Sequence, residues 1–173
     1  MNFLKLYSKQ LQSFTQKRRS STTSSFIHRV SLQGANALLG KFIHPDSGLF
    51  DACLTGLEIV EFTPGYAKSK LLVSPPLSNS YNTLHGGAIS TIVDVMGTVA
   101  LLTKDQTKAG VTVELNTSFC SAAKVGSMLE IEGKILKSGR TLGFTQVDIY
   151  SIDNSTETQQ RKLVASGRHT KAF

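Results

Sequence analysis

The stretch YNTLHGGAISTIVDVMGTVALL, residues 81 to 102, decides the fold of this 173-residue chain. It opens as a polar loop, passes through His85, Gly86 and Gly87, and continues as an apolar segment that contains one carboxylate, Asp94. Its apolar residues recur at helical spacing, which predicts one long helix over about residues 86–103. The charged stretch KDQTKAG that follows marks the end of this helix.

On a helical wheel, this segment has two unlike sides. The apolar arc contains Ala88, Ile89, Ile92, Val93, Val95, Met96, Val99 and Ala100, and the opposite arc contains Ser90, Thr91, Asp94, Gly97 and Thr98. Asp94 therefore belongs to a stripe of small residues, where a solvated helix normally carries Lys, Glu and Gln. Such a stripe allows another segment to pack closely against it. The ordinary alternative is that Asp94 only solvates the outer side of the helix.

Strand patterns lie on both sides of the long helix, and a short helix is expected before them at 32–41, ending near Gly40. The expected strand segments are 53–65, 66–76, 111–119, 127–137, 141–151 and 161–173, the last four as a meander. In VTVELNTSF (111–119), Val111, Val113, Leu115 and Phe119 alternate with Thr112, Glu114, Asn116 and Ser118.

A single long helix cannot connect six parallel strands, so the sheet should be largely antiparallel. We predict an α+β domain in which the sheet curls around the helix and buries its apolar arc. This arrangement leaves the far side of the helix and one sheet edge uncovered. A partner subunit is the natural cover for both.

The net charge of +7 belongs to the N-terminal part of the chain. Residues 1–45 carry seven Lys or Arg and no acid, whereas residues 46–173 carry twelve of each sign, which argues against a nucleic-acid partner. The basic, amphipathic, Ser- and Thr-rich start predicts a mitochondrial targeting segment at 1–33, with matrix localisation. A basic tail without a targeting function is the alternative. The folded domain is expected at 34–173.

Several classes of site are not expected from the sequence. There is no apolar run of about 18 residues for a membrane span. Cys53 and Cys120 lack CxxC spacing, so we expect two reduced, buried thiols and no disulfide or zinc site. GxSxG, GxxxxGK[ST] and His/Glu metal spacings are also missing, and neither a cofactor nor a metal is expected.

Gly86 and Gly87 stand at the expected start of the long helix. The first N–H groups of a helix lack internal acceptors, and glycine lets a ligand oxygen approach them closely. Such a pair can stabilise the oxyanion that forms when a carbonyl is attacked, or it can simply make a tight turn. His85 can act as a base or can cap the turn, and the structural role is favoured.

The stretches NTLHGGAISTIVDVMGTVALL, AGVTVELNTSFCSAAKVG, ILKSGRTLGFTQVDI and ASGRHTKAF follow one another in this chain. Together they resemble the hotdog-fold acyl-CoA thioesterases, in particular the acyl-CoA thioesterase 13 group (thioesterase superfamily member 2) of the PaaI-like branch. The resemblance covers about residues 50–172. It implies a hotdog fold, one long helix wrapped by a six-stranded, largely antiparallel sheet, in a homodimer and further in a homotetramer.

The resemblance also implies roles for single residues. Gly86 would polarise the thioester carbonyl with help from Asn79, and Asp94 would be the general base at the carbonyl held by Gly86 of the other subunit. Thr112 stands where the family has a water-orienting serine. Contacts to substrate or CoA would come from His85, Gly87, Phe119, Lys124, Lys137, Gly139, Arg140, Thr141 and His169. Lys124, Lys137 and Arg140 would bind CoA phosphates. A semi-buried interface would raise the pKa of Asp94 above its ordinary value of about 4.

The implied reaction is hydrolysis of fatty acyl-CoA, of medium to long chain, to free fatty acid and CoA. Two alternatives remain: a non-catalytic subunit that binds acyl-CoA or regulates, and a hotdog hydratase or dehydratase. The presence of Asn79, Gly86, Asp94 and a hydroxyl at Thr112 favours hydrolysis over the binding subunit. Hydratases of this fold pair a catalytic histidine with an acid in a different layout.

Overall fold

The computed structural model describes residues 31–153 and 160–173. Its helices are α2 (Leu32–Ile43) and α3 (Gly86–Lys104), with short 3-10 turns η1 (Pro45–Ser47), η2 (Phe50–Leu54) and η3 (Pro75–Leu77). Its strands are β1 (Glu58–Thr63), β2 (Tyr66–Leu72), β3 (Val111–Phe119), β4 (Met128–Ser138), β5 (Leu142–Asp153) and β6 (Gln160–Ala172). Most of the expected targeting segment lies outside the described residues, so both this segment and the domain boundary stay predictions.

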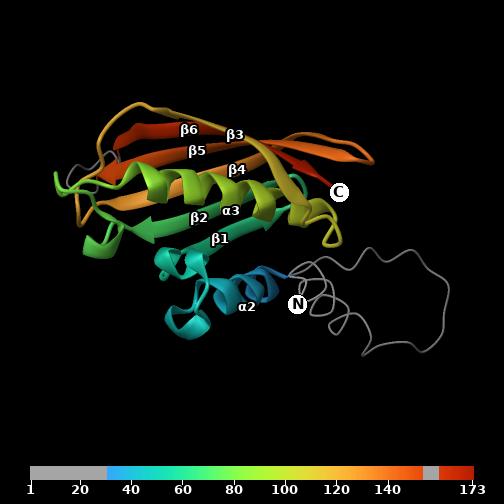
Figure 1. Ribbon diagram of the computed structural model, residues 1–173, viewed down its shortest axis with the longest axis horizontal. Coiled ribbons are helices and arrows are strands. Elements are labelled where there is room, and N and C mark those ends of the chain that lie inside the picture. Colours follow the sequence, from blue (N-terminus) through green and yellow to red (C-terminus); the bar gives the residue numbers. More distant parts are fainter. Residues whose placement is uncertain (1–30, 154–159) are drawn as a thin grey trace.

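All six strands form one antiparallel sheet in the order β1-β2-β4-β5-β6-β3. The expected α+β architecture is confirmed, because the sheet curls around α3 (Figure 1). The expected meander of the last four strands is wrong in one respect. Only β4, β5 and β6 form a meander, while β3 pairs with β6 at the far edge. After β3 the chain crosses back to β4, which lies between β2 and β5. Strand patterns alone do not reveal this crossing.

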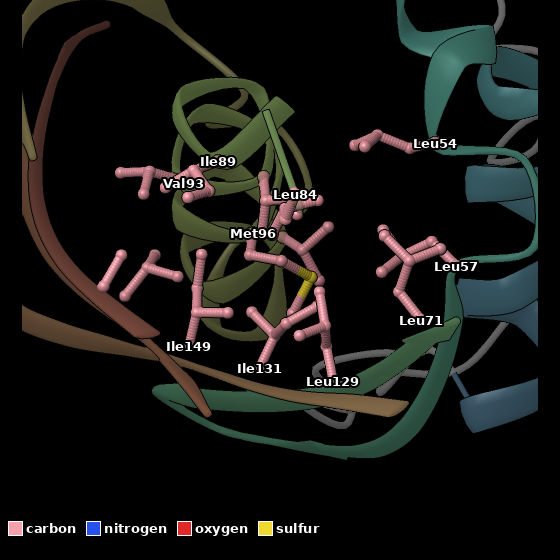
Figure 2. Close-up of a cluster of buried hydrophobic side chains, with 14 of the residues drawn as sticks. Leu54, Leu57, Leu71, Leu84, Ile89, Val93, Met96, Leu129, Ile131 and Ile149 are labelled. Atoms are coloured by element: carbon pink, nitrogen blue, oxygen red, sulfur yellow. The ribbon is translucent and has the colours of Figure 1, made fainter. Parts of the chain in front are cut away.

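The apolar arc of α3 faces the concave side of the sheet, as the wheel predicts. Figure 2 shows Ile89, Val93 and Met96 above Leu129, Ile131 and Ile149 of the sheet, with Leu54 and Leu57 closing the core beside them. Burial of each such side chain stabilises the folded state by roughly 1.5–3 kcal/mol, which explains why α3 lies at the centre of the domain. By length and composition α3 would also pass for a membrane span, but half of it is buried inside the domain.

The later part of the small-residue stripe of α3, at Gly97 and Thr98, packs against the protein's own sheet. Gly97 is buried, and a Cβ atom built on it would lie 2.4 Å from Nδ1 of His169 and 2.7 Å from Oγ1 of Thr145. The stripe thus admits side chains of β5 and β6, and it is glycine at 97 that makes this close approach possible.

β3 departs from the strict alternation predicted for it. The β3–β6 register shifts between Thr112 and Glu114, whose partners Lys171 and Thr170 are consecutive, so Val113 is an extra residue in a β-bulge. Because of this bulge, Thr112 and Leu115 both reach the side of the sheet that faces α3. Without it, Thr112 would point away from the helix with Glu114.

The first helix is longer than expected and braces the opposite edge of the sheet. α2 continues through Gly40 to Ile43, since no left-handed residue ends it at 40. Its Asn36 exchanges two hydrogen bonds with the backbone of Ile59 on β1, at 2.7 and 2.8 Å. These bonds and the packing of Leu39 cover an edge that would otherwise remain open.

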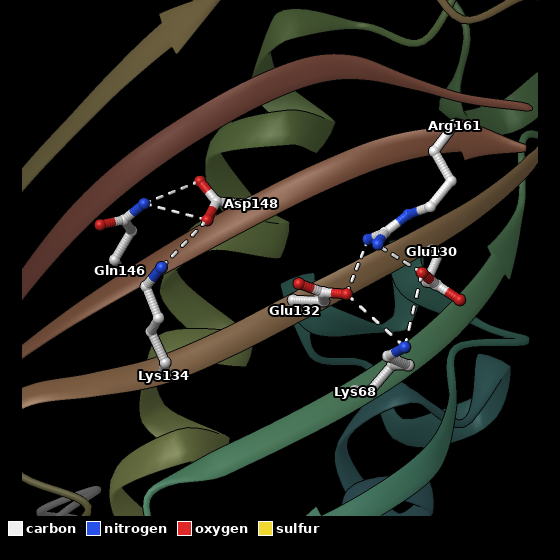
Figure 3. A network of polar contacts seen from close by, with 7 residues as sticks. All are labelled: Lys68, Glu130, Glu132, Lys134, Gln146, Asp148 and Arg161. Carbon is white, nitrogen blue, oxygen red and sulfur yellow. Dashed lines mark hydrogen bonds and ion pairs between the residues drawn. The ribbon is translucent and has the colours of Figure 1, made fainter.

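The outer face of the sheet carries a polar network that spans four strands (Figure 3). Arg161 lies 2.6 Å from Glu132 and 2.9 Å from Glu130, and Lys68 lies 3.5 Å from each of the same carboxylates. A second group joins Lys134 to Asp148 at 3.6 Å. The two groups contain three cations and three carboxylates, so their charges balance.

The two cysteines are free, as expected. Cys53 is half-buried, whereas Cys120 is exposed, so the expectation of two buried thiols is wrong for Cys120. Cys120 directly follows the edge strand β3, where the chain leaves the sheet.

Candidate active site

The start of α3 has the geometry of an oxyanion site. His85 is the N-cap residue, and its Nδ1 accepts a hydrogen bond of 2.8 Å from the Gly87 N–H. The structural role favoured for His85 is therefore the observed one. The Gly86 N–H has no acceptor in the part of the chain that the structure describes. A carbonyl oxygen can bind there, at the positive end of the helix dipole.

Asp94 lies two turns further along α3 and meets residues from β3 and β6. The Thr112 hydroxyl donates a hydrogen bond of 2.8 Å to Oδ1 of Asp94, and Nε2 of His169 lies 3.0 Å from the same oxygen. Nζ of Lys171 lies 3.9 Å from it. The other oxygen, Oδ2, receives no hydrogen bond from residues 31–153 or 160–173. One oxygen is thus held in place while the other is free to accept a proton.

The pKa of Asp94 is lowered to about 2, mainly by the hydrogen bond from His169, with further contributions from Thr112 and Lys171. Burial acts in the opposite direction and is the second-largest effect. The expectation of a raised pKa is therefore wrong for the single chain. Hydrogen bonds that stabilise the charged form outweigh desolvation, because the carboxylate is still 45% exposed. Asp94 is an ionised group, ready to accept a proton.

His169 is placed beside Asp94 and has no exposed side-chain surface. Its Nδ1 has no hydrogen-bond partner among the described residues, whereas Nε2 faces the carboxylate of Asp94 and the hydroxyl of Thr112, each at 3.0 Å. This arrangement favours the tautomer with the proton on Nε2. The side chain thus offers no surface to a CoA molecule in the single chain, and its Nε2 contacts the carboxylate of Asp94 instead.

Two charged residues near Asp94 were missed by sequence reasoning. Lys171 is buried, with 9% of its side chain exposed, and Asp51 of η2 is half-buried. Lys171 follows His169 by two residues on β6, so strand periodicity was the signal that both face α3. No comparable signal exists for Asp51, since η2 reaches α3 only through the tertiary fold.

The remaining predicted residues form two groups at opposite ends of α3. Near its start, the Phe119 ring lies 3.5 Å from the position of a Cβ on Gly86, and exposed Lys124 pairs with Thr83 of the loop before the helix. Asn79 lies in that loop. Its side-chain oxygen accepts hydrogen bonds from the N–H groups of Tyr81 and Thr83, and its amide donates to the Thr83 hydroxyl at 3.0 Å. Asn79 therefore holds the loop in shape.

The second group lies on the β4–β5 hairpin, beside the end of α3 (Figure 1). Lys137, Gly139, Arg140 and Thr141 are all exposed there. Lys108, just after α3, donates a hydrogen bond of 2.9 Å to the Gly139 carbonyl and fixes the turn. α3 has 19 residues and is roughly 27 Å long, so the two groups are not brought together within one chain.

Gly86 and Asp94 are also apart. Eight residues of helix separate them by roughly 12 Å, which is too far for both to act on one thioester carbon. One chain therefore does not bring together the Gly86 N–H, which can bind a carbonyl oxygen, and the ionised carboxylate of Asp94.

Comparison with known proteins identifies the family. Residues 81–158 match the thioesterase superfamily model. Acyl-coenzyme A thioesterase 13 of Homo sapiens is 38% identical over 122 residues, 70% of this chain and 83% of that protein. The crystal structure of zebra fish thioesterase superfamily member 2 is 34% identical, covers 82% of this chain and 97% of its own, and has a TM-score of 0.74. The crystal structure of thioesterase superfamily member 2 from Mus musculus is 33% identical, covers 87% of this chain and 98% of its own, and has a TM-score of 0.69. The chain therefore belongs to the thioesterase superfamily, as a hotdog-fold member of the acyl-CoA thioesterase 13 group.

Proposed function

We propose that this protein hydrolyses fatty acyl-CoA to free fatty acid and CoA in a site shared by two copies of the chain. The observation that carries the proposal is the carboxylate of Asp94, with Oδ1 held by Thr112 and His169 and Oδ2 left free. The family relationship supports the substrate, since the relatives are named acyl-CoA thioesterases.

In this proposal a water molecule lies at Oδ2 of Asp94, which takes one of its protons. The resulting hydroxide attacks the thioester carbon, and the Gly86 N–H of the partner stabilises the oxyanion. The C–S bond then breaks and CoA leaves as a thiolate. A thiolate is a good leaving group, so no strong general acid is required. Thr112 and His169 act by orienting the base.

Exposed apolar side chains on β3 support a dimer of this chain. This edge strand presents Val111, Val113 and Phe119 to solvent, with 51%, 57% and 61% of their surface exposed. A long, apolar, unpaired edge is a template for another strand. A two-fold axis beside β3 would place the two α3 helices antiparallel. Gly86 of one copy would meet Asp94 of the other if the helices cross near Ser90, midway between them.

The same antiparallel arrangement supports the proposed CoA contacts. It would bring the β4–β5 hairpin of one copy toward Phe119 and Lys124 of the other, so the two groups that are apart in one chain would converge. Lys137, Arg140 and Lys124 would then surround the CoA phosphates. The main-chain and side-chain contacts proposed for His85, Gly87, Gly139 and Thr141 belong to the same two surfaces.

The first test measures thiol release from acyl-CoAs of increasing chain length, for wild type and for Asp94→Asn. We expect wild type to turn over medium- and long-chain substrates, and the variant to lose kcat by roughly 10³-fold while it remains folded. If wild type binds CoA but releases no thiol, the protein is a binding subunit. If Asp94→Asn keeps full activity, Asp94 is not the base.

A mixing experiment tests the shared site. Alone, Asp94→Asn is expected to lose kcat by roughly 10³-fold and Gly86→Ala to lose kcat/KM by roughly ten- to hundredfold. In a mixed dimer, one of the two sites combines an intact Asp94 with an intact Gly86. Co-refolding equal amounts should therefore restore about a quarter of wild-type kcat, because half of the dimers are mixed and each has one working site. If activity is not restored, Gly86 and Asp94 do not work together across the interface.

Assembly, chain length and location complete the proposal. We place the protein as a homotetramer in the mitochondrial matrix, on the basis of the family resemblance and the acid-free basic tail. Exposed Tyr81 and Phe119 beside the start of α3 supply apolar surface for a medium to long acyl chain. Native mass tests the homotetramer, and the location of a fluorescent protein fused to residues 1–33 tests the mitochondrial placement.

A further inference from the structure

Lys171 on β6 is a buried charged residue. Lysine is almost never buried unless it is paired, yet only 9% of this side chain is exposed. The mechanism proposed above does not use it. Burying an ammonium group costs free energy, so its surroundings must compensate for the loss of water.

The contacts of Lys171 lead to one turn of α3. Its Nζ donates a hydrogen bond of 2.9 Å to Oγ1 of Thr98, and that hydroxyl donates one of 2.8 Å to the main-chain carbonyl of Asp94. The ammonium is therefore tied to the backbone of Asp94 through a single side chain. Its Nζ also lies 3.9 Å from Oδ1 of the Asp94 carboxylate, within ion-pair distance.

Two carboxylates act on this one cation. Burial lowers the pKa of Lys171 and is the largest effect on it, while Asp94 on α3 and Asp51 in η2 act in the opposite direction. Burial raises the pKa of Asp51, and the negative charge of Asp94 raises it further. His169, on the same strand as Lys171, is the other titratable group that faces Asp94. The local charges are thus two carboxylates with one ammonium.

We propose that Lys171 is a positioning residue of the active site, whose buried ammonium, bound to Thr98 and within ion-pair distance of Oδ1 of Asp94, helps to keep Asp94 an ionised base. The inference rests on the role proposed for Asp94. Without this cation, the negative charge of Asp51 would favour the protonated form of Asp94. In the assembled dimer this tendency would grow, because the partner and the acyl chain would remove water from Asp94.

The test is the pH dependence of kcat between pH 4.5 and 8 at saturating acyl-CoA, followed by loss of thioester absorbance. Wild type should stay level down to pH 4.5. Lys171→Met should lose up to about fourfold in kcat at pH 4.5 relative to pH 7, because the pKa of Asp94 starts from about 2 and loss of a cation at this distance raises the pKa of a carboxylate by roughly one to three. Adding Asp51→Asn to Lys171→Met should restore most of that loss. Lys70→Met, which removes an exposed lysine on β2, is the matched control.

Methionine has nearly the length of lysine and suits a buried site, so Lys171→Met should fold. Thr98→Val provides an independent variant, because it removes the acceptor that holds Nζ and should produce a smaller loss at low pH. The proposal is overturned if both variants follow the wild-type profile, or if kcat falls by the same factor at every pH. A loss that Asp51→Asn does not restore refutes the part that concerns Asp51. Full activity of Asp94→Asn would instead refute the base itself.

Discussion

Gly97→Ala tests the packing that holds His169 against Asp94. The added Cβ would lie 2.4 Å from Nδ1 of His169 and 2.7 Å from Oγ1 of Thr145. Both neighbours are 1% exposed and belong to central parts of the sheet, so neither can move into solvent. His169 would have to shift by about 1 Å to reach an ordinary contact distance. Such a shift breaks its 3.0 Å contact with Asp94.

The expected cost has two sources. Overpacking of a dense core costs roughly 1–3 kcal/mol, and a hydrogen bond to a charged group contributes roughly 1.5–3 kcal/mol. Because Asp94 is partly exposed and can relax, we expect the free energy of unfolding to fall by about 2–4 kcal/mol in total. The loss of the His169 hydrogen bond should also raise the pKa of Asp94. Because the carboxylate would then be less well oriented, kcat should fall by roughly tenfold.

The assay is urea unfolding at a fixed protomer concentration, together with kcat for one acyl-CoA. Gly40→Ala in α2 is the matched control, because a Cβ built there meets no atom within 4 Å. That variant should be more stable than wild type by about 0.5–1 kcal/mol, since alanine is the better helix former. If Gly97→Ala unfolds at the wild-type midpoint and keeps wild-type kcat, the contact with His169 does not orient Asp94.

Three further predictions follow from the same geometry. Thr112→Ser should keep kcat within about twofold, while Thr112→Val, which cannot donate to Asp94, should lower kcat by roughly tenfold, as steady-state kinetics will show. Gly86→Ala should melt like wild type, because the new Cβ meets only the Phe119 ring at 3.5 Å. Its kcat/KM should nevertheless fall roughly ten- to hundredfold, because the methyl group blocks the substrate carbonyl. A kcat/KM equal to that of wild type would exclude an oxyanion site at Gly86. The lowered pKa of Asp94 adds stability that is fully present above pH 3.8 and is lost as pH falls toward about 2. Wild type should therefore lose about 1 kcal/mol relative to Asp94→Asn between pH 5 and 2, after allowance for exposure and screening, as denaturant curves at each pH will test.

The sequence alone determined most of the secondary structure. The period of the apolar residues defined α3 to within one residue of its end, and the alternation in VTVELNTSF defined β3 from Val111 to Phe119. Both patterns are local, because a helix or a strand that packs on the core with one side carries apolar residues at its own period. The helix start at Gly86 and the solitary place of Asp94 were visible for the same reason.

The tertiary structure alone decided the chemical environment of Asp94. Its partners Thr112 and His169 come from β3 and β6, which are neighbours only because β3 crosses to the far edge of the sheet. A single bulged residue, Val113, turns Thr112 toward the helix and reverses what alternation predicts. The direction of the pKa shift, the burial of Lys171 and the approach of Asp51 all depend on this packing. Charges interact over distances in space, and the order of residues along the chain does not contain those distances.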